Sequence, residues 1–425
     1  MDLMKMSREE LVSAQADLKK KYEDFKAMGL KLDMSRGKPG PEQLDLSEGI
    51  LTVLHSNSQV KSDGTDVRNY GGLEGLKACR ELFAELLGVS VNNVIAGGNS
   101  SLTMMYDTML RLWVFGASRG GSPWQSEEKV RFLCPAPGYD RHFAVTQQLG
   151  IEMITVPMLE DGPDMDRVEA LVAGDPTIKG MWCVPMYSNP EGKTYSDETV
   201  RRLAKMKTAA PDFRIFWDNA YCVHHLYPEH DHVLNMLDEC KKVGNEDRVL
   251  MFASTSKVTY PGAGVAVLVA SEANIAWTCD IMKVQAIGPD KVNQLRHVLY
   301  FKNADGIHAH MAKQAEILRP KFQAVLDALD KNLAGTGAGT WHAPRGGYFV
   351  SFNAMPGCAK RIHQLCKDAG LVMTGAGATY PYGKDPQDSN LRIAPSYPSV
   401  DELKTAMELF CTCALLAAVE KKLEA

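Results

Sequence analysis

The sequence has no long apolar run. None of its hydrophobic stretches approaches the roughly 18 residues that a membrane-spanning helix needs. The first ten residues lack the apolar core of a secretion signal. The 10 cysteines are scattered over 425 residues without a Cys-x-x-Cys pair. We therefore expect a cytoplasmic protein with reduced thiols and no membrane contact.

The sequence also lacks a strong charge of either sign. Its 47 Lys and Arg residues and 52 Asp and Glu residues give a net charge of −5, which argues against general nucleic-acid binding. Hydrophobic residues make up 45% and charged residues 23%, as in ordinary globular proteins. A chain of this length predicts two domains, one large and one small.

Short apolar runs alternate with helical patterns through the middle of the chain. The runs cover 94–96, 130–134, 153–156, 181–184, 214–217, 249–253 and 265–270. A further helical pattern covers 73–87. This alternation predicts an α/β fold with a mostly parallel, seven-stranded sheet between helices.

The two ends of the chain show a different pattern. A polar amphipathic helix over 7–29 reads as a surface or partner-contacting arm. A long helix over 307–333 is expected to be kinked or divided at Pro320. A strand over 347–352 and helices over 358–369 and 400–423 then predict a small α+β domain. The predicted divisions are 1–45 (N-terminal arm and part of the small domain), 46–306 (large domain) and 307–425 (linker helix and small domain).

A lysine stands just past one of these predicted strands. Ser254-Thr255-Ser256-Lys257 follows the apolar run over 249–253. A partly desolvated lysine amine loses proton affinity and can attack a carbonyl group. Hydroxyls beside it can donate to a phosphate. Most lysines are solvated surface charges, so the position becomes specific only together with the residues that precede it.

Polar residues follow other predicted strands as well, and ligands of open α/β sheets bind at such strand ends. They are Gly98, Asn99 and Ser100 before a helix, then Tyr139, Asn189, Asp218 and Tyr221. A helix start can bind phosphate. A desolvated aspartate needs a cationic or hydrogen-bonding partner. Taken singly, each has a simpler explanation as a turn residue, a helix cap or a core tyrosine.

Together these residues resemble the fold-type I, pyridoxal-phosphate-dependent aminotransferases of the aspartate aminotransferase superfamily. The resemblance runs in order from about Met34 to Arg392. It implies that Lys257 holds the cofactor as a Schiff base and that Asp218 pairs with its pyridine nitrogen. It also implies that Asn189 and Tyr221 bond the phenolic oxygen, that Tyr139 stacks on the ring, and that Gly98, Asn99, Ser100, Ser254 and Ser256 surround the phosphate.

The same resemblance implies a substrate site shared between two subunits. Arg392 in Leu391-Arg392-Ile393-Ala394 would grip the substrate α-carboxylate beside Gly37. Tyr70 in Asn69-Tyr70-Gly71-Gly72 would reach the phosphate of a partner subunit in a homodimer. For the distal carboxylate of a dicarboxylic substrate, Arg36, Lys38, Lys291 and Arg345 all stay open as candidates.

One position departs from the family pattern. The family usually has a phosphate-binding arginine eight residues after the lysine, where this chain has Val265. Another cation must take that role, and Lys291 and Arg296 are the candidates. The runs around Met34 to Pro39, Gly138 to His142 and Gly288 to His297 are similar to the divergent bacterial subgroup that includes aspartate aminotransferases.

The sequence thus predicts a transaminase that uses aspartate and 2-oxoglutarate. Two alternatives on the same scaffold are a β-lyase and an aminotransferase of aromatic or neutral amino acids. A regulator with an aminotransferase-like sensor domain is disfavoured, because the residues before Ser35 are too few for a DNA-binding module. A metal site at His224, His225, His230 and His232 ranks below a solvated loop, because their spacing fits no standard ligand pattern.

Overall fold

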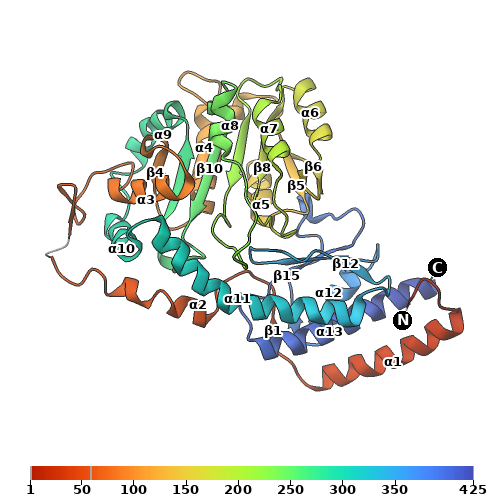
Figure 1. Ribbon diagram of the computed structural model, residues 1–425. Coiled ribbons are helices and arrows are strands. Elements are labelled where there is room, and N and C mark those ends of the chain that lie inside the picture. Colours follow the sequence, from red (N-terminus) through yellow and green to blue (C-terminus); the bar gives the residue numbers. More distant parts are fainter. Residues whose placement is uncertain (1, 58–59, 425) are drawn as a thin grey trace.

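The computed structural model describes residues 2–57 and 60–424. Met1 and Ala425, which the predicted domain divisions include, lie outside the described residues. One large sheet lies between helices, and a smaller sheet packs with the helices of the two chain ends (Figure 1). Within the described residues, no helix combines the length and the apolar content that spanning a bilayer would require.

The large sheet contains all seven predicted strands and one more. Its order is β4-β11-β10-β9-β8-β5-β6-β7. The strands are β4 (Val94–Ala96), β5 (Arg131–Ala136), β6 (Glu152–Leu159), β7 (Gly162–Pro163), β8 (Ile178–Cys183), β9 (Arg214–Asp218), β10 (Val249–Ser254) and β11 (Ala266–Ala270). The predicted number of seven misses β7, a two-residue edge strand that has no apolar run to reveal it.

The strand directions bring six carboxyl ends to one edge of this sheet. Strands β5, β6, β8, β9 and β10 pair in parallel. Strand β11 is antiparallel to both β10 and β4, so β4 points the same way as β10. The loops after β4, β5, β8, β9 and β10 therefore meet, as expected for the ligand edge of an open α/β sheet.

Helices bury both faces of the large sheet, which explains why its strands are continuous apolar runs. Helices α3 (Lys77–Leu87), α6 (Met165–Gly174), α7 (Asp197–Lys205), α8 (Met236–Lys242) and α10 (Lys291–Phe301) share one core with strand residues such as Met251. Helices α4 (Ser101–Phe115), α5 (Asp140–Gln148) and α9 (Glu272–Gln285) share the other with Leu250 and Phe252. Helix α3 begins four residues later than the predicted 73, after a loop that contains Gly75.

The smaller sheet has the order β12-β13-β15 and is antiparallel. It consists of β12 (Gly339–Trp341), β13 (Val350–Ala354) and β15 (Asn390–Ile393). Its core also takes in α1 (Arg8–Ala27), α11 (Ala304–Leu333), α12 (Ala359–Asp368) and α13 (Val400–Glu424). The predicted strand over 347–352 lies three residues further along as β13. The division bounds at 45/46 and 306/307 stay predictions.

The structure adds detail at two of the helices outside the large sheet. Helix α11 is 30 residues long and continues through Pro320, so of the two predicted alternatives, a kink or a division, the division is wrong. Helix α1 buries Leu11, Leu18 and Phe25, and it packs along α13 (Figure 1). It is therefore part of the small-domain core.

Short elements connect the two parts of the chain. Strand β1 (Leu32–Asp33) pairs in parallel with β14 (Leu371–Val372). Helix α2 (Pro41–Asp45) follows β1, and β2 (Lys61–Ser62) pairs with β3 (Thr65–Asp66) in a small hairpin. The β1–β14 pairing ties residues 35–38 to the small domain, beside the carboxyl edge of the large sheet.

Candidate active site

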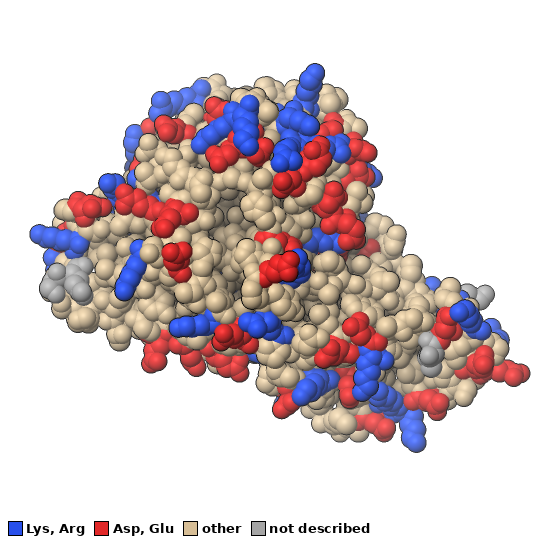
Figure 2. All heavy atoms as spheres, viewed as in Figure 1, with Lys and Arg blue, Asp and Glu red and all other residues tan. Residues whose placement is uncertain are grey.

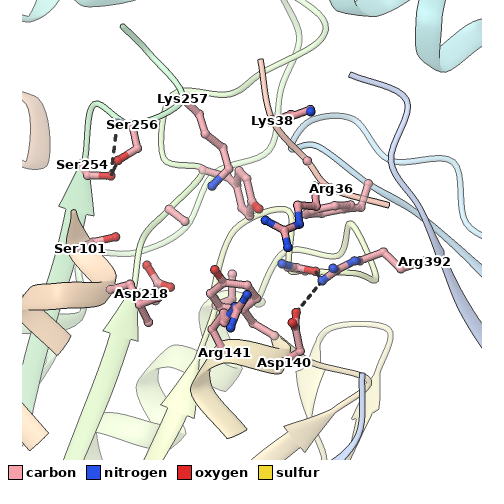
Figure 3. A pocket seen from close by; sticks show the side chains of 18 of the residues that line it. Arg36, Lys38, Ser101, Asp140, Arg141, Asp218, Ser254, Ser256, Lys257 and Arg392 are labelled. Carbon is pink, nitrogen blue, oxygen red and sulfur yellow. Dashed lines mark hydrogen bonds and ion pairs between the residues drawn. The ribbon is translucent and has the colours of Figure 1, made fainter. Parts of the chain in front are cut away.

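A cavity of about 560 Å³ lies at the carboxyl edge of the large sheet (Figure 3). Most of the residues singled out in the sequence line it. They are Arg36, Gly37, Ser100, Tyr139, Asn189, Asp218, Tyr221, Ser254, Ser256, Lys257 and Arg392. Arg392 comes from the small sheet, so the cavity lies between the two parts of the fold.

Lys257 enters the cavity from the loop after β10. Its Nζ lies 5.1 Å from the centre of the Tyr221 ring and 5.9 Å from that of Tyr348. Burial lowers the pKa of Lys257 below its ordinary value, Arg392 lowers it further, and Asp218 opposes both. A lowered pKa leaves more of the amine neutral and nucleophilic near neutral pH.

Asp218 ends β9, and its two carboxylate oxygens have different surroundings. Oδ2 lies 2.9 Å from Nε2 of His142, a buried ring that stacks on Trp182 at 4.3 Å. Oδ1 is buried and has no hydrogen-bond partner within the described chain. A buried acceptor without a partner is costly, so Oδ1 calls for a donor from a ligand.

The two cavity tyrosines keep their protons at neutral pH. Burial raises the pKa of Tyr139 to about 12 and raises that of Tyr221 well above its ordinary value. Both hydroxyls can therefore donate hydrogen bonds to a ligand oxygen. Tyr139 also sets its ring edge-on against His142, with centroids 4.9 Å apart.

Hydroxyl groups gather at the start of α4. Ser100 caps this helix by accepting from the Thr103 backbone N–H. Ser254 donates to Ser256 over 3.1 Å, and Ser256 donates to the carbonyl of Asn99 over 3.2 Å. A helix start with hydroxyls around it suits a phosphate group.

The predicted phosphate loop is only partly in place. Ser100 and its neighbour Ser101 line the cavity, whereas Gly98 and Asn99 do not. The Asn99 side chain turns away and donates to the carbonyl of Pro261. The helix begins one residue beyond Ser100, so the serines at its start lie nearer the cavity than the preceding glycine turn.

The two predicted substitutes for the usual phosphate arginine do not reach this cavity. The Lys291 ammonium donates to the carbonyl of Gly71 over 2.6 Å, and Nε of Arg296 donates to the carbonyl of Ile50. Val265, which stands at the arginine's place, is buried in the core under the sheet. Lys291 does not line the cavity of its own chain, and its assignment to the cofactor stays a prediction.

Arg392 is only 7% exposed and is held by three side chains. Its Nη1 donates to Asp140 at 3.0 Å and to Asn189 at 3.1 Å, and its Nη2 donates to Thr374 at 3.0 Å. Its guanidinium lies 4.7 Å above the Phe349 ring. This burial excludes a role for Arg392 in a surface ion pair.

Gly37 is required by close packing beneath this arginine. A Cβ at Gly37 would lie 2.5 Å from the Phe349 ring, closer than carbon atoms can approach. The neighbouring Arg36 and Lys38 also line the cavity, although the Lys38 ammonium lies 3.7 Å from the centre of the Tyr397 ring. Arg345 does not line it and instead bonds the carbonyl of Glu229.

Sequence reasoning missed several residues of this cavity. Ser101, Asp140, Arg141 and Thr374 line it, and His142 lies behind Asp218. Asp140, Arg141 and His142 open the helix that follows β5, so their position at a strand end was a usable signal. Thr374 has no such local signal, because it follows the two-residue strand β14 and contacts Arg392, 18 residues further along the chain.

Tyr70 does not reach the cavity of its own chain. Its side chain is 83% exposed, in the segment that precedes α3. Its placement at a partner's site therefore stays a prediction.

The four loop histidines show no metal-binding geometry. Within the described part of the chain, no three His, Cys, Asp or Glu side chains are arranged to hold a metal ion. The rings of His225 and His230 stack on each other at 3.6 Å.

The ionisable residues of the cavity carry a net positive charge. Its lining includes five cations (Arg36, Lys38, Arg141, Lys257 and Arg392) and two carboxylates (Asp140 and Asp218). By contrast, charges of both signs are mixed over the outer face shown in Figure 2. A cavity with this excess attracts ligands with several negative charges.

Comparisons with known proteins agree with this geometry. The family described as "Aspartate amino-transferase" matches residues 6–425. The aspartate aminotransferase of Corynebacterium glutamicum is 49% identical over 404 residues, covering 95% of this chain and 93% of that protein. These matches confirm the resemblance read from the motifs.

Solved structures show the same relationship. The crystal structure of an aspartate transaminase from Corynebacterium glutamicum has a TM-score of 0.96 and 47% identity, and 99% of each chain is covered. The α-aminoadipate aminotransferase LysN of Thermus thermophilus, complexed with N-(5′-phosphopyridoxyl)-L-leucine, has a TM-score of 0.73 and 20% identity, with 99% and 96% covered. The second likeness concerns the fold alone.

Proposed function

This chain belongs to the aspartate aminotransferase family, and on that premise we propose that it transfers the amino group of aspartate to 2-oxoglutarate, giving oxaloacetate and glutamate. The observation that carries the proposal is one cavity that holds the Lys257 amine, a partnerless oxygen of Asp218 and the guanidinium of Arg392. A nucleophile, a buried acceptor and a carboxylate-binding cation are the groups that amino transfer requires.

Pyridoxal phosphate fits these residues. The free Oδ1 of Asp218 would accept from the protonated pyridine nitrogen, and the serines at the start of α4 would bind the phosphate. Tyr221 and Asn189 would bond the phenolic oxygen, Tyr139 would stack on the ring, and Lys257 would hold the group covalently. When bound, the cofactor draws electrons away from the substrate Cα.

The side chains of this chain would then direct the reaction. Arg392 binds the substrate α-carboxylate and so fixes the amino acid over Lys257. When free, the Lys257 amine would take up and give back the Cα proton, as a general base and acid. Asp218, held by His142, would keep the pyridine nitrogen protonated.

A dicarboxylic substrate suits the charge of the cavity. Three cations besides Lys257 and Arg392 line it (Arg36, Lys38 and Arg141), and none of the three makes an ion pair with any residue in the described ranges. The Lys38 ammonium lies against the Tyr397 ring, which leaves Arg36 and Arg141. One of these two would bind the distal carboxylate. Lys291 and Arg345, which were also candidates, do not line the cavity.

The enzyme would act as a cytoplasmic homodimer with shared active sites. Tyr70 is exposed, and yet the carbonyl of the adjacent Gly71 is held by the buried Lys291. An aromatic side chain held outward in this way fits contact with a second copy of the chain, whose phosphate group it would approach.

A substrate screen tests the proposed function. The purified protein with pyridoxal phosphate is mixed with aspartate, glutamate, alanine, leucine or phenylalanine, and formation of the pyridoxamine form is followed by absorbance. We expect aspartate and glutamate to exceed the others about 100-fold in kcat/KM, or about 2.7 kcal/mol. Equal turnover of alanine or phenylalanine would refute the dicarboxylate specificity and leave amino transfer standing. No conversion by any amino acid would refute amino transfer itself.

A further inference from the structure

The hydrogen bonds of Arg392 divide its guanidinium into a bound side and a free side. Nη1 donates both of its N–H groups, one to Asp140 and one to Asn189. Nη2 donates one to the Thr374 hydroxyl. Nε is buried and has no partner among the residues that the structure describes. An arginine has five N–H donors, so two are left.

The two remaining donors are Nε–H and one N–H of Nη2, and these two nitrogens share one edge of the guanidinium. Nε–H points to the side away from Cδ, where Nη2 also lies. Two parallel N–H groups on one edge match the two oxygens of a carboxylate. The hydrogen bonds that hold Nη1 therefore determine that the Nε–Nη2 edge faces a substrate.

The bond between Asp140 and Arg392 also joins the two parts of the fold. Asp140 is the first residue of α5, beside the large sheet, and Arg392 lies in β15 of the small sheet (Figure 3). Lys257 and Asp218 belong to the large sheet as well. A contact that holds Arg392 to that sheet sets the distance between a bound α-carboxylate and the reacting amine.

Asp140 does not serve to attract the substrate, because its carboxylate has the same negative charge as the carboxylates of the substrate. A carboxylate 3.0 Å from Arg392 offsets part of the positive charge that would attract a substrate carboxylate. An acidic residue at this position lowers the affinity for the substrate unless the orientation that it gives to Arg392 compensates for the loss. The cavity retains Arg36, Lys38 and Arg141 as further cations, so its excess of positive charge survives.

We propose that Asp140 is a positioning residue: it holds Nη1 of Arg392 so that the Nε–Nη2 edge receives the α-carboxylate of the substrate. This inference rests on the proposed function for the identity of the ligand. Asp140 acts only through Arg392 and takes no part in proton transfer.

The test measures binding and turnover separately. Succinate has two carboxylates but no amino group, so its Kd, from calorimetry on the enzyme loaded with pyridoxal phosphate, reports binding alone. For Asp140→Ala we expect the succinate Kd and the KM for aspartate to rise about 10-fold or more. Asp140→Asn keeps an oxygen acceptor at the same place and should restore both to within about 3-fold of the wild-type values.

Two further variants control for the helix. Asp140→Ser keeps a side chain that favours a helix start but is too short to reach Arg392, and it should behave like Asp140→Ala. Asp197→Ala removes the first-residue aspartate of α7, an exposed side chain whose charge pairs with Arg201. It should leave the succinate Kd and the KM unchanged. Thermal unfolding of every variant checks that it folds.

The outcomes separate this inference from the proposed function. Unchanged or tighter succinate binding in Asp140→Ala and Asp140→Ser would overturn the positioning role, as would an Asp140→Asn variant no better than Asp140→Ala. If the wild type failed to transaminate aspartate while the Asp140 variants changed the succinate Kd as expected, the proposed function would be refuted and the positioning role would be supported.

Discussion

Oδ2 of Asp218 lies 2.9 Å from Nε2 of His142, whereas Oδ1 of the same carboxylate is buried with no partner in the described chain. The histidine is fixed in turn by stacking on Trp182. One oxygen thus orients the carboxylate and the other is left to accept from a ligand. This asymmetry is the strongest structural reason to expect a protonated ring nitrogen beside β9.

Asp218→Ala should remove the acceptor for that nitrogen. We expect turnover to fall about 10³-fold or more, several kcal/mol in the barrier, because the ring loses its ability to take up electrons. Cofactor attachment should persist, since Lys257 is untouched. The measurement is kcat with aspartate alongside the absorbance of the bound cofactor. Near-normal turnover would reduce Asp218 to a structural residue at the end of β9.

The cofactor should be attached to Lys257 alone. Two lysines of the described residues line the cavity; the Lys257 amine lies beside Tyr221, whereas the Lys38 ammonium lies against Tyr397. Borohydride reduction followed by peptide mapping should place a pyridoxyl label on Lys257. Lys257→Ala should take up no label. A label on another lysine would refute the assignment.

The pH dependence of cofactor capture should follow the charge on Lys257. Burial lowers its pKa, so the rate at which the cofactor-free protein captures pyridoxal phosphate should rise with pH through a midpoint below about 10.4. Asp218 raises this pKa and Arg392 lowers it. Asp218→Asn should therefore move the midpoint to lower pH, and Arg392→Gln should move it to higher pH. Stopped-flow absorbance measures both, and shifts of the opposite sign would contradict this electrostatic account.

The reactive residues at the strand ends could be predicted from the sequence, because each directly follows an apolar run. Lys257, Asp218 and Asn189 each follow an apolar strand, and parallel strands bring their carboxyl ends to one edge. The same logic extends to Asp140 and Arg141 after β5, although their roles were not recognised. What the sequence shows in these cases is position, and position alone does not reveal which neighbour a side chain binds.

Other features depend on contacts between distant segments. Lys291 has the right charge for a phosphate, but the carbonyl of Gly71, 220 residues away in sequence, takes its hydrogen bond. The undivided α11 shows the same limit, because packing in the small-domain core outweighs the local preference of Pro320. Strand β7 is two residues long and carries no periodic signal.

Tyr70 offers a test of site sharing. If Tyr70 completes the site of a partner, Tyr70→Ala and Lys257→Ala should each lack most activity, and their mixture should regain some. A mixed dimer has one site with both residues intact, so random exchange should restore about a quarter of wild-type activity. The measurement is turnover after subunit exchange, with exchange verified by differently tagged chains. No recovery despite exchange would place Tyr70 outside the site.

The distal carboxylate should be bound by Arg36 or Arg141. Both line the cavity, and neither has an ion-pair partner within the ranges described (Figure 3). Replacing the residue that binds this carboxylate with Gln should lower kcat/KM for aspartate about 100-fold and leave that for alanine nearly unchanged, because alanine has no distal carboxylate. Arg345→Gln is the matched control, since Arg345 bonds Glu229 away from the cavity, and it should change neither value. Equal losses for aspartate and alanine would instead assign the arginine to the α-carboxylate or the phosphate, and no loss in either variant would contradict a dicarboxylate site built from this chain's own cations.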